Sequence, residues 1–553
     1  MDSLSLKVEK LTSLKSESGS TEKHTFVYDV IVVGAGFAGM YMLHELRKIG
    51  LNVLVLEEAT GVGGTWYWNR YPGARCDVES MEYSYSFSNE LQQEWNWSHR
   101  FSTQPEILEY ANHVADRFDL RGHIKFETRV NSVEYEAGEK QWLLRSSSGE
   151  EFYGRYCVMA TGTLSSVNQP KFAGLDKYQG DWYVTGRWPH DGVDFSGKNV
   201  GIIGTGSSAV QAIPVIAKEA KHLTVFQRTA NYSIPAKNRP LESNEVDDIK
   251  NRYAEIRKQA RENRAGIASM KPGLNTAMSV SETERHDEYQ RRWDEGGTGF
   301  TAAYSDIGTD DTANFTAAEF VRDKIKETVN NSVTAELLSP TNTIGCKRLC
   351  ADTDYYETYN RVNVTLLDVN VDPIKGLVKE GVQTENNVYE FDIVIFAIGF
   401  DAMTGALLSM NIKGKEGLQL RDIWSDGPQS YLGLSMAGFP NLFTITGPGS
   451  PSVLSNMMTS IEQHVEWIRD CLSYMEAGGF REIEPKPSAE ERWMSHVEEI
   501  AANTLRYTCN SWYVGANIPG KKRIFMPYAG GIPPYREKCD QVAASGYDGF
   551  NIS

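Results

Sequence analysis

A glycine-rich turn at residues 34–39 constrains the fold of this chain more than any other stretch. The turn has the spacing GxGxxG, follows an apolar run at 28–33, and precedes a helical pattern at 40–47. A second apolar run at 53–56 ends in Glu57. A strand, a glycine turn, a helix and a strand, closed by an acid about 20 residues past the glycines, are typical of a dinucleotide-binding unit.

Each conserved-spacing position in such a unit has a physical role. Gly34 makes the tight turn, Gly36 lets the backbone approach a diphosphate, and Gly39 lets the helix lie close to the strand. The free N–H groups at the start of the helix then attract the diphosphate. Glu57 can accept hydrogen bonds from a ribose diol, as in sites that bind FAD or NAD. The alternative is a purely structural turn beside a surface glutamate.

A second unit of the same kind follows at residues 199–229. The apolar strand 199–203 leads into GTGSSA at 204–209, where Ala209 takes the place of the third glycine. The next strand ends near Arg228, and an arginine can pair bidentately with a 2′-phosphate where an acid would repel it. Two units with opposite charge preference predict an FAD site followed by an NADPH site.

The composition excludes several classes of protein. At 553 residues the chain is too long for one core, and we expect two or three domains. A formal net charge of −17 argues against a broad nucleic-acid-binding surface, and no apolar run is long enough for a membrane span. Charged residues interrupt any N-terminal signal sequence, so we expect a cytoplasmic protein. Seven scattered cysteines predict no disulfide framework, and ten histidines without ligand spacing predict no metal.

The order of strand and helix patterns predicts an α/β protein with two Rossmann-like dinucleotide-binding domains and a helical insertion. The strand at 391–400 resembles the strand that ends at Gly162, so we expect the chain to return to the FAD domain there. The predicted segments are a flexible tail at 1–24, an FAD-binding domain at 25–165 and 391–553, an NADPH-binding domain at 175–235 and 341–390, and a helical insertion at 236–340.

Residues 178–189 resemble the fingerprint of the Baeyer–Villiger monooxygenases, which lies between the two glycine turns. The fingerprint reads Phe-x-Gly-x-x-x-His-x-x-x-Trp followed by Pro or Asp; Tyr178 replaces the phenylalanine and Val184 replaces the histidine. The resemblance extends over nearly the whole chain from about residue 26. It is carried further by GGTWYWNRYPGARCD (63–77), IGTGSS (203–208), TVFQRTANYS (224–233), KRLC (347–350), YNRVNV (359–364) and SWYVGANIPGKK (511–522).

This resemblance implies an oxygenase that depends on FAD and NADPH. In that family NADPH reduces the flavin, O2 adds to form a C4a-peroxyflavin, and this species attacks a ketone to give an ester or lactone. The partners implied are therefore a small-molecule ketone and O2. We expect no nucleic acid and no membrane partner, and a monomer or a weak homo-oligomer.

The resemblance also assigns roles to particular residues. Arg348 matches the catalytic arginine and Asp77 the acid that pairs with it; taken alone, they would be a surface arginine and a loop acid. Trp512 matches a tryptophan on a mobile loop that closes over the nicotinamide, although a core aromatic is the commoner fate of a tryptophan. Lys347, Arg228 and Thr229 match contacts to the 2′-phosphate. The other residues expected at the two cofactors are Gly34, Gly36, Phe37, Gly39, Glu57, Thr65, Trp66, Tyr83, Val130, Gly204, Thr205, Gly206, Ser207 and Ser208.

Three other functions remain open at this point. The first is a related flavin monooxygenase that oxidises sulfides or amines. The second is a pyridine nucleotide–disulfide reductase, which shares the paired folds but needs a redox-active cysteine pair that the sequence does not show. The third is a non-oxygenating, NADPH oxidase-like or non-catalytic flavoprotein, which is favoured if Val184 reports a lost activity. No nucleophile elbow is present, which argues against a hydrolase.

Overall fold

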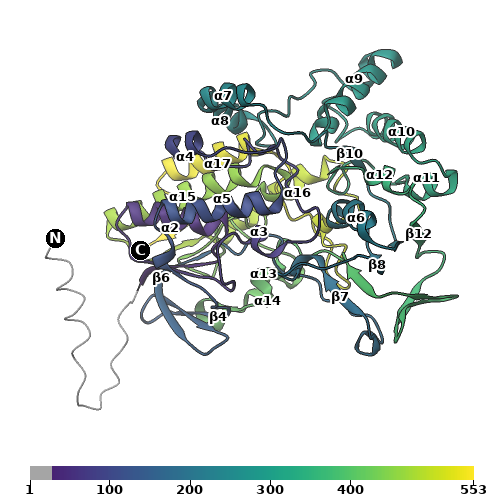
Figure 1. Ribbon diagram of the computed structural model, residues 1–553. Helices are drawn as coiled ribbons and strands as arrows, with labels where there is room; N and C mark the ends of the chain where they lie inside the picture. The colour runs from purple at the N-terminus through teal and green to yellow at the C-terminus, as the bar shows by residue number, and fades with distance from the viewer. Residues whose placement is uncertain (1–27) are drawn as a thin grey trace.

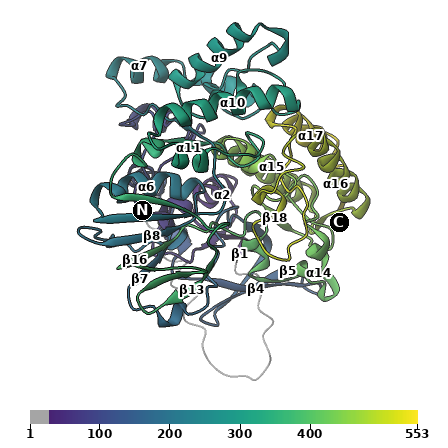
Figure 2. The same ribbon diagram turned by 90° about the vertical axis from the view of Figure 1, so that its right-hand side faces the viewer.

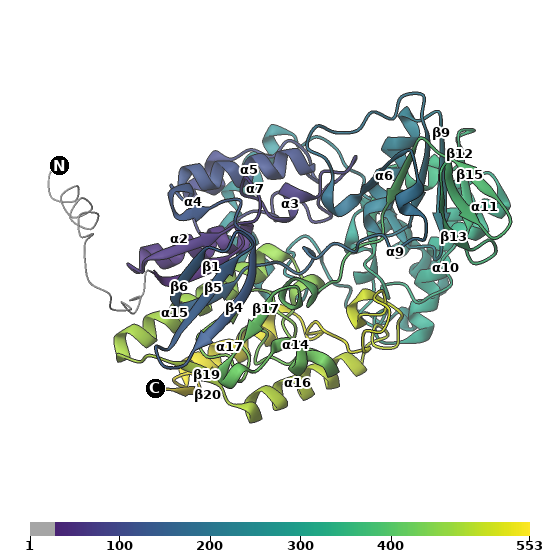
Figure 3. The ribbon, with the colours of Figure 1, turned by 90° about the horizontal axis from the view of Figure 1, so that it is seen from below.

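Two sheets, each built around one of the glycine turns, organise the structure, and Figure 3 shows them side by side. The computed structural model describes residues 28–553; the tail expected at 1–24 lies outside them. No helix of the described residues is long and apolar enough to cross a bilayer.

The first sheet has the strand order β17-β4-β5-β6-β1-β2-β3, with β18 beside β6. Strand β1 runs parallel to β2 and β6, and β4, β5 and β6 form an antiparallel excursion within the same sheet. The strands are β1 (Tyr28–Val33), β2 (Val53–Leu56), β3 (Ile124–Lys125), β4 (Val130–Glu136), β5 (Gln141–Ser146), β6 (Glu151–Met159), β17 (Asn411–Lys413) and β18 (Leu442–Thr444).

The centre of this sheet is apolar on both faces because helices cover it. Val30 and Val32 of β1 are fully buried in the largest core cluster, and so are Met40 of α2 and Ile468 of α15. Near-continuous apolar runs are typical of parallel strands that are buried on both sides. The helices of this domain are α2 (Phe37–Lys48), α3 (Thr65–Trp68), α4 (Asn89–Glu94), α5 (Gln104–Arg117), α13 (Gly405–Leu408), α14 (Leu420–Ile423), α15 (Met457–Gly478), α16 (Pro487–Ala502) and α17 (Ile532–Ala544).

The second sheet is parallel and has the order β12-β9-β8-β16-β7, with β8 leading through the second glycine turn into α6. Smaller sheets flank both domains: β10 pairs with β11, β13 and β15 both pair with β14, and β19 pairs with β20. The elements are β7 (Asp181–Val184), β8 (Asn199–Ile203), α6 (Ser207–Glu219), β9 (His222–Gln227), β10 (Ser233–Pro235), β11 (Cys350–Asp352), α12 (Tyr355–Thr358), β12 (Val364–Asp368), β13 (Ile374–Val378), β14 (Gly381–Thr384), β15 (Val388–Glu390), β16 (Ile393–Phe396), β19 (Ile483–Pro485) and β20 (Phe550–Ile552).

Strand β16 belongs to the second sheet, so our placement of the segment from residue 391 in the FAD domain is wrong at this strand. The likeness to the strand that ends at Gly162 has a structural cause. Strand β6 lies beside β1 and β16 beside β8, so the two strands hold equivalent places in two similar domains. A Cβ on Gly34 would lie 2.7 Å from Ala160 O, and one on Gly204 would lie 2.4 Å from Ala397 O. The chain returns to the first sheet only with β17, which pairs with β4.

The predicted helical insertion is confirmed, and Figure 2 shows its helices α7, α9 and α10 along one side of the molecule, above both sheets. Several of them begin at residues with strong capping side chains. Ser281 forms a reciprocal capping box with Glu284, and the Asp310 side chain caps α10. The helices are α7 (Ser243–Asn251), α8 (Tyr253–Glu262), α9 (Glu282–Glu295), α10 (Asp311–Thr328) and α11 (Ser332–Leu338), labelled in Figure 1.

The cysteines differ from the expectation in one pair. Cys346 and Cys509 form a disulfide, with Cα atoms 5.6 Å apart, where we expected none. The two residues are 163 positions apart and share no spacing motif, so only the fold brings them together. Cys346 directly precedes Lys347 and Arg348, and Cys509 precedes the loop of Trp512. The other five cysteines are free and buried.

Candidate active site

The first glycine turn is shaped for a ligand that approaches its backbone. Gly34 has φ +103°, and a Cβ on Gly39 would lie 1.8 Å from Gly34 O, so this helix can lie against the turn only without a side chain. Gly36 is the N-cap of α2 and provides no side-chain hydrogen bond. The N–H groups of the first helical turn are therefore left for an anion such as a phosphate.

Glu57 lies buried at the end of β2, next to the same turn. Its Oε2 accepts a hydrogen bond from Ala35 N at 2.6 Å and its Oε1 one from Ala59 N at 2.8 Å. Burial raises the pKa of Glu57, although these two N–H groups oppose the shift. A carboxylate offers about four acceptor positions, so Glu57 can still accept from a ribose diol. Thr128 N donates to Glu57 O at 2.8 Å, which brings the start of β4, and with it Val130, to this end of the sheet.

The aromatic residues predicted to contact the flavin lie together beside the first turn. Trp66 Nε1 donates to Tyr83 Oη at 3.1 Å, and the Phe37 ring meets the Tyr83 ring edge to face at 6.1 Å. Thr65 is exposed at the start of α3, while Trp66 and Phe37 are buried. The structure thus brings four of the predicted residues into one cluster.

The second glycine turn has the same backbone design but is more open. Gly206 is the N-cap of α6 without a side-chain hydrogen bond, and a Cβ placed there would meet nothing within 4 Å. Gly206 and Ser207 are exposed, Ser208 is half-buried, and the buried Thr205 donates through Oγ1 to Thr229 O at 2.8 Å. The residues predicted for the second dinucleotide therefore surround one accessible helix N-terminus.

Two cations stand beside this turn without a carboxylate. Arg228 is exposed at the end of β9, and Lys347 is half-buried. Burial and the neighbouring Arg228 guanidinium lower the pKa of Lys347. Within residues 28–553, neither side chain forms an ion pair with an acid. Two close cations that share no acid favour a bound anion, which is the charge that a 2′-phosphate brings.

Asp77 and Arg348 form a bidentate ion pair where the two dinucleotide-binding units meet. Arg348 Nε donates to Asp77 Oδ2 at 2.6 Å, and its Nη2 donates to Asp77 Oδ1 at 2.7 Å. Arg348 Nη1 donates to Val453 O at 3.0 Å, which fixes the plane of the guanidinium. Burial raises the pKa of Asp77, but Arg348 outweighs it and leaves that pKa below its usual value. Asp77 in turn raises the pKa of Arg348, so the guanidinium stays charged.

The loop of Trp512 is tied to the segment that follows β16. Asn517 Nδ2 donates to Phe400 O at 2.7 Å, and Lys521 Nζ pairs with Asp401 Oδ1 at 2.6 Å. The Trp512 ring is half-buried, with its centroid 4.2 Å from that of Tyr513. Tyr513 is 3% exposed; burial raises the pKa of its hydroxyl, and the Arg348 guanidinium opposes this shift. Trp512 therefore contacts a buried ring that lies within the electrostatic reach of Arg348.

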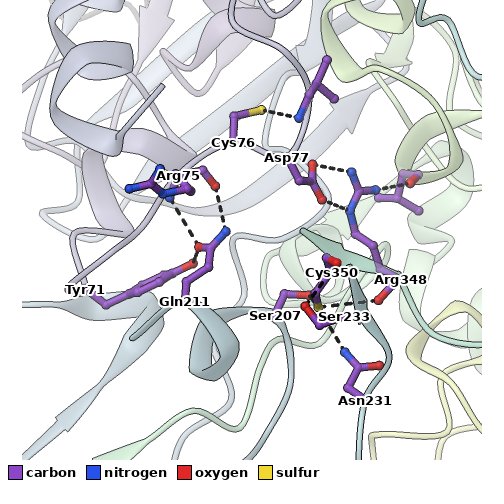
Figure 4. A network of polar contacts seen from close by, with 12 residues as sticks. Tyr71, Arg75, Cys76, Asp77, Ser207, Gln211, Asn231, Ser233, Arg348 and Cys350 are labelled. Atoms are coloured by element: carbon purple, nitrogen blue, oxygen red, sulfur yellow. Dashed lines mark hydrogen bonds and ion pairs between the residues drawn. The ribbon is translucent and has the colours of Figure 1, made fainter. Parts of the chain in front are cut away.

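The sequence motifs did not predict several residues of this site. Gln211 joins α6 to the loop before Asp77, and Ser207 contacts Cys350, as Figure 4 shows. The ring of Tyr513 contacts that of Trp512. The motif KRLC does point to Cys350, and Gln211 lies one helical turn after Ser207. Val184 lies elsewhere, in an apolar cluster with Ile203 and Phe396.

These observations fit the two dinucleotide cofactors. Each turn lacks the side chains that would fill a diphosphate site, each helix N-terminus is uncapped, and an acid and two cations stand where a diol and a phosphate are expected.

Known proteins resemble this chain along nearly its whole length. A family model described as pyridine nucleotide-disulphide oxidoreductase matches residues 31–286, which include both glycine turns. A "Baeyer-Villiger monooxygenase" of Pseudooceanicola batsensis is 44% identical over 94% of this chain and 95% of its own length. "Phenazine N-monooxygenase PhzNO1" of Lysobacter antibioticus is 43% identical over 95% and 96% of the two chains. A solved structure, "Oxidized steroid monooxygenase bound to NADP", is 50% identical, covers 95% and 99%, and has a TM-score of 0.91.

Proposed function

The chain belongs to the Baeyer–Villiger monooxygenases, and we propose that Asp77 and Arg348 are the residues with which it carries out their chemistry. The enzyme uses FAD, NADPH and O2 to oxidise a ketone to an ester or lactone. The observation that supports our assignment is the bidentate pair that holds Arg348 at the junction of the two dinucleotide-binding units.

The bound cofactors supply hydride transfer and the activation of O2, and the protein supplies charge and orientation. Oxygen transfer to a carbonyl develops negative charge, which a fixed guanidinium stabilises without giving up a proton. Asp77 holds Arg348 in one orientation, and Val453 O adds a third contact. In this proposal the loop of Trp512 and Tyr513, whose Tyr513 ring is buried, would help to exclude water from the site.

The remaining site residues bind the cofactors in our proposal. The first turn, Glu57 and the cluster of Phe37, Thr65, Trp66 and Tyr83 hold FAD, with Val130 at the edge. The second turn holds the NADPH diphosphate, while Arg228, Thr229 and Lys347 hold its 2′-phosphate. Trp512 closes over the nicotinamide.

The proposed main substrate is a small ketone. A relative named for N-oxidation of phenazine is about as similar as the relative named for Baeyer–Villiger oxidation, so the test must include other acceptors. The panel consists of cyclic, aryl and steroid ketones, a thioether and an aromatic N-heterocycle. We expect the highest ratio of product to NADPH consumed with a ketone. A higher ratio with the thioether or the heterocycle would favour the alternative.

Arg348→Ala tests the catalytic assignment. We expect the variant to retain FAD and to lose ester formation by about a hundred- to a thousandfold, as expected for a group that stabilises a developing anion. Arg239→Ala is the matched control, because Arg239 forms a similar bidentate pair with Glu245 in the helical insertion. Near-wild-type ester formation by Arg348→Ala would remove Arg348 from the mechanism.

Two properties of the whole protein complete the proposal. We expect the enzyme to work in the cytoplasm, where NADPH is supplied, and as a monomer or a weak homo-oligomer. Sedimentation at two protein concentrations measures the second property. A stable higher oligomer would contradict it.

A further inference from the structure

The side chain of Gln211 on helix α6 forms three hydrogen bonds with the segment that carries Asp77. Its Oε1 accepts hydrogen bonds from Tyr71 Oη at 2.8 Å and from Arg75 N at 3.4 Å. Its Nε2 donates to Arg75 O at 3.1 Å. Arg75 is two residues before Asp77, so the amide of Gln211 holds both backbone groups of the residue that leads into the ion pair (Figure 4).

The same helix contacts the segment that carries Arg348. Cys350 is two residues after Arg348, and its Sγ donates to Ser207 Oγ at 3.3 Å. Asn231 Nδ2 donates to the same sulfur at 3.1 Å, so the buried thiol is held from two sides. Ser207 and Gln211 are four residues apart and therefore lie on one face of α6. One helix face thus reaches both partners of the ion pair.

At Gly73 the loop at 71–77 lies directly against α6. A Cβ on Gly73 would lie 2.4 Å from Gln211 O and 3.0 Å from Val215 Cγ2. The loop therefore rests on the helix backbone, and a shift of α6 must be followed by the loop or must break the contacts of Gln211. Packed interfaces of this kind transmit displacements because they are not continuously deformable.

We propose that Gln211 is a positioning residue that makes the geometry of the Asp77–Arg348 pair depend on NADPH bound at the N-terminus of α6. The dinucleotide fixes the start of the helix, Gln211 passes that position to Arg75, and Asp77 then orients Arg348. The inference rests on the proposed binding of NADPH at the second turn and does not require ketone oxidation.

The first test follows the loop by amide hydrogen exchange in the FAD-loaded enzyme, with and without NADP⁺. Gln211→Met keeps a similar volume and removes all three hydrogen bonds. We expect NADP⁺ to slow exchange at residues 71–77 in the wild type and to lose most of that effect in Gln211→Met. The affinity for NADP⁺, measured by titration, should change by less than about tenfold, because Gln211 has no direct role in binding the dinucleotide and the indirect effect should not exceed that of about one neutral hydrogen bond.

Gln92→Met is the matched control. Gln92 is a buried glutamine of α4 that accepts a hydrogen bond from Arg257 Nε at 3.0 Å and has no contact with the loop. It should keep the protection of 71–77 by NADP⁺. Equal protection in the wild type and Gln211→Met would overturn the proposal. If Gln211→Met does not fold, Gln211→Leu replaces it, because Leu also lacks all three hydrogen bonds; full protection in that variant would overturn the proposal equally.

The second test asks whether Gln211 acts through Asp77. The rate of anaerobic flavin reduction by NADPH is measured in the wild type, Gln211→Met, Asp77→Ala and the double variant. We expect the single variant Gln211→Met to reduce its flavin about tenfold more slowly than the wild type. We expect the double variant to reduce its flavin at the same rate as Asp77→Ala alone. Multiplied effects in the double variant would show a general structural role and overturn the proposal. NADP⁺ that fails to bind the wild type would instead overturn the assignment of the second turn.

Discussion

The two dinucleotide-binding units share a design and differ in how much of it is covered. Both have a glycine with positive φ at the turn, both begin the helix at an uncapped glycine, and both place the turn against the carbonyl of an alanine that directly follows a neighbouring strand. In the first unit, a Cβ on Gly64 would lie 2.9 Å from Gly36 Cα, so a glycine loop lies over the turn. In the second unit, Gly206 and Ser207 are exposed.

The strand ends show the same difference. Glu57 is 5% exposed and already bound by two N–H groups, while Arg228 is exposed and has no acid beside it. A covered, pre-organised site favours a cofactor that stays bound, because release would require the covering loop to move. An open site with cations that form no ion pair favours a cofactor that binds and leaves in each turnover. The comparison teaches that the same backbone design can bind a cofactor permanently or release it in each turnover, depending on whether a loop covers the turn.

The largest effect that tests this comparison comes from exchanging glycine and alanine at the third position of each turn, Gly39 in the first and Ala209 in the second. Gly39→Ala puts a Cβ 1.8 Å from Gly34 O, a contact with backbone that cannot move aside. We expect the variant to be purified without FAD or not to fold, because overpacking against a main chain costs more than the usual 1–3 kcal/mol, roughly. Flavin absorbance of the purified protein measures the result.

The second unit provides the control for this change. Ala209 already occupies the equivalent position and is fully buried, so Ala209→Gly should keep FAD and weaken the fold by about 1 kcal/mol. Normal FAD content in Gly39→Ala would mean that the two turns are less different than their geometry indicates.

A buried acid in the second domain gives the next largest effect. Asp352 accepts hydrogen bonds from Ser233 Oγ and Tyr355 N, and burial raises its pKa to about 7. The folded state therefore holds a proton that the unfolded chain loses as pH rises through its ordinary value of 3.8, and stability falls between that pH and about 7. The loss reaches about 4 kcal/mol, and Asp352→Asn should remove it.

Thermal unfolding of the wild type and Asp352→Asn across this pH window measures the difference. We expect the stability of Asp352→Asn relative to the wild type to increase as pH rises, and this difference in stability to stay constant above about pH 7. A gap independent of pH would show that Asp352 is ionised in the folded protein. Glu57 differs from Asp352 in its role: both carboxyl groups are buried, but only that of Glu57 is assigned to the binding of a cofactor.

Sequence patterns predict the parts of this molecule that are local. The glycine turns, the acid at Glu57, the helical insertion and the strand at 393–396 all follow from short-range spacing. Contacts between distant segments do not: the pairing of β16 with β8, the disulfide of Cys346 with Cys509, and the contact of Gln211 with Arg75 join residues that no periodicity links. The pair of Asp77 with Arg348 was predicted, but through the resemblance of two motifs.

The preference for NADPH over NADH tests the open end of the second unit. Arg228→Ala should lower the ratio of specificity constants for NADPH and NADH by about ten- to a hundredfold, the effect of one charge-assisted contact. Arg361→Ala is the control. Arg361 lies before the start of β12, whereas Arg228 lies after the end of the neighbouring parallel strand β9, so the two arginines are at opposite ends of the strands. An unchanged ratio in Arg228→Ala would remove Arg228 from the 2′-phosphate site.

The smallest effect concerns Val184, at the end of the edge strand β7, where the sequence departs from the fingerprint of its family. Val184 is 6% exposed, pairs with Phe396 and packs against Ile203. Val184→His would place a polar ring among apolar side chains, which costs about 1–3 kcal/mol if the ring finds no partner. We therefore expect an active wild-type oxygenase, and a variant with lower thermal stability and no gain in product per NADPH.

Tyr178→Phe is the informative companion, because it restores the other fingerprint position. Tyr178 Oη donates to Phe391 O at 3.0 Å, so its loss removes one buried hydrogen bond and costs about 1 kcal/mol without placing a polar group among apolar ones. Both variants are compared with the wild type by product formed per NADPH consumed on the best ketone of the panel. A higher ratio in Val184→His alone would assign this position to the coupling of the two units, whereas equal ratios would leave Val184 as part of the apolar packing that holds β7 against β16.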